Sequence, residues 1–98
     1  MALDLLVMLQ AELNMHSLPA GRSEQLQQLL SAAQVRIRQT GITPDLENVG
    51  DCQLIVDYAA WMWKRRAQTA TAQMPPYLSL DIRNRLVAEK GRVSNGEA

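Results

Sequence analysis

The residues of this chain whose types could do chemistry are few and far apart. His16 is the only histidine, and Cys52 is the only cysteine. A zinc site needs several such ligands at short spacing, and a nucleophilic cysteine needs a base beside it. We therefore expect His16 to be a solvated side chain and Cys52 to be a small buried hydrophobic residue. A single cysteine also excludes an intrachain disulfide.

Acidic residues and glycines give no catalytic pattern either. The carboxylates are spread singly along the chain, and the pair Asp45 and Glu47 offers no matching acid–base arrangement. The 5 glycines each punctuate a segment and do not form a phosphate-binding loop. We therefore expect a protein that is not an enzyme and uses no cofactor, with no catalytic, cofactor-binding or metal-ligating residue.

Basic and aromatic residues remain as candidates, because two tryptophans precede two arginines in one short stretch. Basic residues interleaved with aromatic ones can bind nucleic acid. However, Arg and Trp also anchor many protein interfaces, and cations near a helix C-terminus complement the helix dipole. We favour this structural role or a protein contact over nucleic-acid binding, and the locally basic last segment is either a solvated face or a contact with an acidic partner surface. The predicted subunit or partner interface comprises Trp61, Trp63, Arg65, Arg66, Arg83 and Arg85.

The composition indicates one small domain that assembles with others. The chain has 98 residues, of which 47% are hydrophobic, and Lys plus Arg equal Asp plus Glu at 10 each. This balance argues against an autonomous nucleic-acid binder, whose affinity depends on neutralising phosphates, and against a membrane-surface protein. It also gives little repulsion between copies. The apolar stretch 1–9 is too short to span a bilayer and lacks the pattern of a signal peptide, so the cytoplasm is the expected default location.

Hydrophobic periodicity places these residues on helices, because the alternation typical of strands is missing. The first predicted helix covers about 3–15. The second follows an N-cap at Ser23 and stops before Gly41, and the third follows an N-cap at Asp51 and runs to about residue 67. The fourth covers about 76–89 and is ended by Gly91. The expected fold class is all-α, a small bundle of about four helices, with a helical domain over 1–91 and a flexible C-terminal tail over 92–98.

The third predicted helix is apolar around most of its circumference. On a helical wheel its hydrophobic residues leave a narrow polar stripe made of Gln53, Asp57 and Lys64. Such a helix is expected at the centre of a large protein, and a chain of this length has few other helices to cover it. The pattern therefore predicts that another subunit buries the remaining apolar face.

Several short motifs follow one another in a fixed order. The sequence Leu-Leu-Ser-Ala-Ala-Gln-Val-Arg-Ile over 29–37 leads into Thr40-Gly41-Ile42. Then come Leu-Ile-Val-Asp-Tyr-Ala-Ala-Trp over 54–61, the pair Arg65-Arg66, and Met74-Pro75 before Leu78. Over about residues 3–86, this order resembles the small head–tail connector proteins of tailed phages and prophages, also called DNA-packaging or head-completion adaptors.

The resemblance implies a helical subunit of a ring of about a dozen copies with closed cyclic symmetry. Such a ring docks on the portal protein, offers a surface to a tail-side adaptor or stopper, and lets DNA pass through its channel without sequence readout. It implies a place in the virion at the head–tail junction, and in the bacterial host cytoplasm before assembly. The sequence departs from the family pattern in its long apolar third helix and its short tail.

Two other functions stay open. A small helical DNA-binding regulator could use the second and third helices, although the loop between them is longer than the turn of a helix-turn-helix motif. A helical-bundle dimer of a bacterial regulatory pair is the other alternative.

Overall fold

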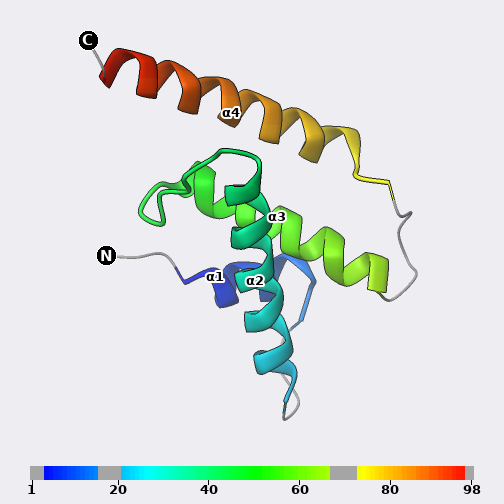
Figure 1. The fold of residues 1–98 in the computed structure, drawn as a ribbon. Helices are drawn as coiled ribbons and strands as arrows, with labels where there is room; N and C mark the ends of the chain where they lie inside the picture. The colour runs from blue at the N-terminus through cyan, green and yellow to red at the C-terminus, as the bar shows by residue number, and fades with distance from the viewer. Residues whose placement is uncertain (1–3, 16–20, 67–72, 97–98) are drawn as a thin grey trace.

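Four helices make up the computed structural model, which describes residues 4–15, 21–66 and 73–96 (Figure 1). They are α1 (Leu5–Glu12), α2 (Arg22–Gln39), α3 (Val49–Arg66) and α4 (Pro76–Gly96). No strand occurs in these ranges. The predicted all-α class is confirmed. His16 lies outside the described residues, as does the stretch 67–72 that follows α3.

Helix α1 is short because single residues beside it, Asp4 and Asn14, end it on both sides. The carboxylate of Asp4 accepts hydrogen bonds from the backbone nitrogens of Leu6 and Val7 over 3.1 and 3.3 Å, so Asp4 is the N-cap residue. Asn14, with φ of 58°, takes the left-handed conformation just after the helix. The helix therefore covers only the middle of the predicted 3–15 segment.

Helix α2 presents one apolar face to the core, as its spacing predicts. All five residues of that face are buried, namely Leu26, Leu29, Leu30, Ala33 and Ile37. The predicted N-cap at Ser23 is wrong, because Gly21 occupies that position with φ of 83° and no side-chain cap. The predicted glycine stop is confirmed: Gly41 follows the helix with φ of 105°, a conformation that other residues rarely adopt.

Helix α3 lies at the centre, in contact with each of the other three helices (Figure 1). The core that they share includes Leu9, Leu26, Ile37, Ile42, Leu54, Ile55, Val56, Ala59, Ala60 and Leu78. A fully buried aliphatic side chain contributes about 2 kcal/mol through the area it removes from water. The tertiary structure of this small chain therefore depends mainly on the packing of α1, α2 and α4 against α3.

The apolar surface of α3 is covered within the chain to a greater extent than its wheel predicts. Seven apolar residues of α3 are buried, namely Cys52, Leu54, Ile55, Val56, Ala59, Ala60 and Trp61, and Tyr58, Met62 and Trp63 are half-buried against the core. The expectation that a large apolar face of this helix needs another subunit is therefore wrong over its first three turns. Apart from the exposed Val49 at its first position, the apolar residues of α3 that remain partly open are Tyr58, Met62 and Trp63.

Helix α4 lies along α3 and runs in the opposite direction (Figure 1). Leu78 is fully buried, and Ile82 and Leu86 pack half-buried against the core, so the predicted inner face is confirmed. The predicted end at Gly91 is wrong, because the helix continues to Gly96. Most of the predicted flexible tail, 92–98, thus belongs to α4, and its last two residues lie outside the described ones.

Candidate interaction surfaces

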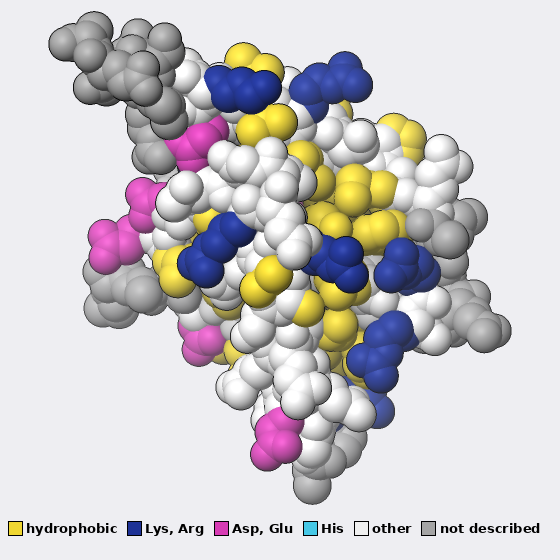
Figure 2. Space-filling view, in the orientation of Figure 1, with side chains coloured by type: hydrophobic (Ala, Val, Ile, Leu, Met, Phe, Trp, Pro, Cys, Tyr) yellow, Lys and Arg dark blue, Asp and Glu magenta, His cyan; other side chains and the backbone are white. Residues whose placement is uncertain are grey.

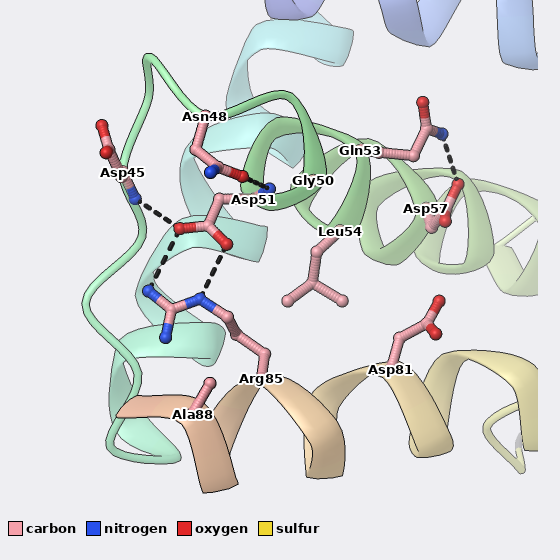
Figure 3. Close-up of a pocket in the computed structure, with 10 residues that line it drawn as sticks. All are labelled: Asp45, Asn48, Gly50, Asp51, Gln53, Leu54, Asp57, Asp81, Arg85 and Ala88. Carbon is pink, nitrogen blue, oxygen red and sulfur yellow. Dashed lines mark hydrogen bonds and ion pairs between the residues drawn. The ribbon is translucent and has the colours of Figure 1, made fainter. Parts of the chain in front are cut away.

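A charged cluster ties α4 to the N-terminal end of α3, and we call it the clamp: Asp51, Arg85, Glu89 and the backbone of Thr43. Figure 3 shows its Asp51 and Arg85. The Arg85 guanidinium makes a bidentate ion pair with the Asp51 carboxylate, in which Nε donates to Oδ1 over 2.7 Å and Nη2 donates to Oδ2 over 3.1 Å. Asp51 is only 6% exposed. A carboxylate that is buried this far is stable only with such partners.

The clamp also fixes the loop between α2 and α3, residues 40–48. Nη2 of Arg85 donates to the carbonyl oxygen of Thr43 over 3.0 Å, and the backbone nitrogen of Thr43 donates to Oε1 of Glu89 over 2.6 Å. The backbone nitrogen of Asp45 donates to Asp51 Oδ2 over 2.8 Å. Loop, α3 and α4 are therefore joined by polar contacts between residues distant in sequence.

The start of α3 differs from its predicted capping. Asn48, not Asp51, supplies the cap, because its Oδ1 accepts from the backbone nitrogen of Asp51 over 3.0 Å. Asp51 lies in the first turn of the helix, where its carboxylate complements the helix dipole and binds Arg85 of α4.

Cys52 is a small buried residue, as predicted. Its side chain is fully buried, and its thiol donates to the carbonyl oxygen of Leu46 over 3.1 Å. Burial and the nearby charges of Asp51 and Asp45 raise the pKa of Cys52 above its ordinary value. A raised pKa keeps the sulfur in its weakly nucleophilic thiol form at neutral pH.

A groove of about 650 Å³ lies between α3 and α4 beside the clamp (Figure 3). Its floor includes Leu54, and its sides carry Asp57 from α3 and Asp81 from α4. Burial, opposed by a hydrogen bond from Gln53 and reinforced by the charges of Glu12 and Asp81, raises the pKa of Asp57. The groove is thus acidic, and ionisation of Asp57 within it is disfavoured. Among the described residues, no group of His, Cys, Asp and Glu side chains is arranged to hold a metal ion.

The C-terminal end of α3 carries the two tryptophans with cations on both. The guanidinium of Arg65 lies 4.9 Å from the ring centroid of Trp61, and that of Arg22 lies 4.9 Å from the ring of Trp63. Trp61 also makes an edge-on contact with Tyr58 at 5.6 Å. Trp61 as a whole is 8% exposed, and its Nε1 is buried without a hydrogen-bond partner among the described residues.

The six predicted interface residues are not gathered at one place. Trp61, Trp63, Arg65 and Arg66 share the end of α3, where Arg65 and Arg66 are exposed and Trp63 is half-buried. Arg83 is exposed on α4. Arg85 instead binds Asp51 inside the chain, a role that sequence reasoning missed because the partners are separated by 34 positions. The sequence does offer one local signal, because Arg85 and Glu89 are four positions apart on the same helix and could form an ion pair. In the structure their charged groups lie 3.8 Å apart.

Charge is distributed unevenly over the surface. On the face shown in Figure 2, several Lys and Arg side chains lie beside an area of hydrophobic side chains near the C-terminal end of α3, and most of the Asp and Glu side chains lie toward the opposite margin, on the side of the 40–48 loop. Although the net charge is zero, the two signs of charge are therefore unevenly distributed over this face.

Comparison with known proteins adds no relative. No protein-family model, no curated protein and no solved structure matches this chain. Over the described residues, none of the helices combines the length and apolar character needed to cross a membrane.

Proposed function

We propose that this protein is a head–tail connector of a tailed phage or prophage, a structural and non-enzymatic subunit that works as a ring. The ring docks on the portal protein, links it to a tail-side adaptor or stopper, and lets DNA pass without sequence readout. Its place is the head–tail junction of the virion, after a period in the host cytoplasm. What carries the proposal is the order and spacing of the motifs between residues 29 and 78.

Those motif residues have structural roles that explain their types. Gly41 has the positive φ that ends α2, and Ile42 immediately after it is 1% exposed. Tyr58 contacts the ring of Trp61 edge-on, and Leu78 anchors α4 in the core. The motifs thus specify a helical scaffold, and the all-α fold agrees with the scaffold that the resemblance implies. The role as a connector comes from the resemblance itself.

The surfaces support an interaction protein. Arg66 and Arg65 are exposed at the end of α3, beside the half-buried ring of Trp63. Arg and Trp side chains at a partly desolvated patch contribute strongly to protein binding. We assign this end of α3 to a partner contact, either with the portal or with a neighbouring copy.

Electron microscopy of the protein mixed with the portal encoded beside its gene tests the proposal. We expect added density at the tail-facing end of the portal, arranged around its axis. The variant Arg66→Glu should reduce this decoration, whereas Arg36→Glu, an exposed change on α2, should leave it intact. A portal that stays bare with the unmodified protein contradicts the connector role.

A small helical DNA-binding regulator is the alternative, and one observation favours it. Lys64, Arg65 and Arg66 end α3 together, and the guanidinium of Arg22 is near them on the ring of Trp63. Such a cluster with aromatic rings suits a phosphate backbone. A gel shift at micromolar protein that weakens steeply with salt supports this alternative, and no shift removes it.

A further inference from the structure

Helix α4 has a second apolar face that points away from the core. Tyr77, Leu80 and Val87 are each more than half exposed, and they follow the 3–4–3 spacing of a helical stripe through Asn84. We call these residues the outer stripe. At 100° per residue they lie on the side of the helix opposite Leu78, Ile82 and Leu86, the residues that face the core. No helix of the described chain covers the outer stripe.

Basic side chains flank the outer stripe along one side. Arg83 and Lys90 are exposed and lie next to Leu80 and Val87 on the helical wheel. In Figure 2, Lys and Arg side chains stand beside hydrophobic ones along the upper edge of the molecule, where α4 runs. The matching surface must therefore combine apolar side chains with negative charge.

The 40–48 loop and the first residue of α3 present that combination. Leu46 is 38% exposed and Val49 is 65% exposed, and the acidic residues Asp45 and Glu47 are exposed next to them. We call these four residues the acidic knob. The clamp holds the knob in place through the bonds from Thr43 and Asp45, so a partner binds it without first having to order it.

We propose that the acidic knob of one copy of this chain docks on the outer stripe of α4 of the next copy. Leu46 and Val49 would cover apolar area around Leu80 and Val87, and Glu47 would approach Arg83. An antiparallel pairing of two outer stripes is disfavoured, because it would bring Arg83 and Lys90 of both copies together. Knob and stripe are different surfaces, so the contact is heterologous, and each added copy leaves one surface open.

This contact adds a specific subunit interface to the proposed function. Only the closure of the row of copies into a ring rests on that function. The facing surfaces are small, with a few apolar side chains on each side, so a single contact is weak and association depends on concentration. Closure or docking on a template would then add contacts and stabilise the assembly.

Sedimentation velocity over a series of protein concentrations tests the contact. We expect reversible self-association of the unmodified full chain, weakened about fivefold or more by either Glu47→Lys or Arg83→Glu. The double variant Glu47→Lys with Arg83→Glu restores opposite charges across the contact and should recover most of the affinity. Val87→Asp should weaken association by more than tenfold, about 1.4 kcal/mol. Arg36→Glu, outside both surfaces, is the matched control and should change nothing.

Three outcomes would overturn the contact. One is a chain that stays monomeric at every concentration. Another is a loss with Val87→Asp but none with Glu47→Lys, which would pair the stripe with a different surface. The last is a double variant no better than its single parents. Circular dichroism of each variant verifies that the helices are retained. Self-association without portal decoration would refute the connector role and leave this contact standing, and the reverse result would do the opposite.

Discussion

The Asp51–Arg85 pair is the residue-scale feature on which the arrangement of α4 depends most. Asp51 is nearly buried, and its side chain is bonded to Arg85 and to the backbone of Asp45. The bonds to Asp51 raise the pKa of Arg85 above its ordinary value, so the guanidinium stays charged over the whole working pH range. Replacement of a buried ion pair by apolar residues can leave the stability unchanged, but removal of one partner leaves the other as an unpaired buried charge.

Arg85→Ala should therefore destabilise the protein by about 2–3 kcal/mol, because Asp51 would stay buried without its cation. Chemical denaturation followed by circular dichroism measures the free energy of unfolding. Arg83→Ala, two positions away and exposed, is the control and should cost less than about 0.5 kcal/mol. Equal effects of the two substitutions would show that the clamp is unimportant for stability.

At the scale of the elements, periodicity predicts the helices well and their ends poorly. The apolar faces of α2 and α4 follow from i,i+4 spacing, and their residues are those that the core contains. Ends depend on single residues: Asn48 caps α3 in place of Asp51, and α4 continues through Gly91. Tertiary contacts decide the rest, since the contact of Thr43 with Glu89 spans 46 positions and leaves no local pattern.

The same substitution, Gly→Ala, should have opposite effects on stability at positions 41 and 91. Gly41→Ala should cost about 1–2 kcal/mol, because φ is 105°, a conformation that is strained for any residue with a Cβ. Gly91→Ala should instead stabilise the protein by about 0.5–1 kcal/mol, since Gly91 is inside α4 with nothing within 4 Å of the added Cβ. Thermal unfolding of the two variants measures both signs. A destabilising Gly91→Ala would indicate that α4 ends where the sequence predicts.

At the scale of the whole molecule, the central position of α3 changes what its apolar sequence means. The hydrophobic wheel predicts a face left for a neighbour, but α1, α2 and α4 bury most of it. Among the described residues, Val49 at the start of α3 is the one large exposed apolar side chain on that helix, and the others include the outer stripe of α4 and Leu46 of the acidic knob. A sequence cannot show this, because both faces of α4 have helical spacing and only the packing decides which one is covered. At the end of α3, the half-buried ring of Trp63 is what remains open to a partner.

The two tryptophans report on that partner contact. Trp61 is 8% exposed and Trp63 is half-buried, so we expect acrylamide to quench Trp63 several-fold more strongly than Trp61 in the isolated chain. The variants Trp61→Phe and Trp63→Phe each leave one reporter, and their fluorescence separates the two signals. If the end of α3 contacts the portal or a neighbouring copy, Trp63 should become protected in the assembly while Trp61 stays unchanged. Equal protection of both rings in the isolated chain would contradict the exposure seen here, and an unprotected Trp63 in a decorated portal would remove the end of α3 from the interface.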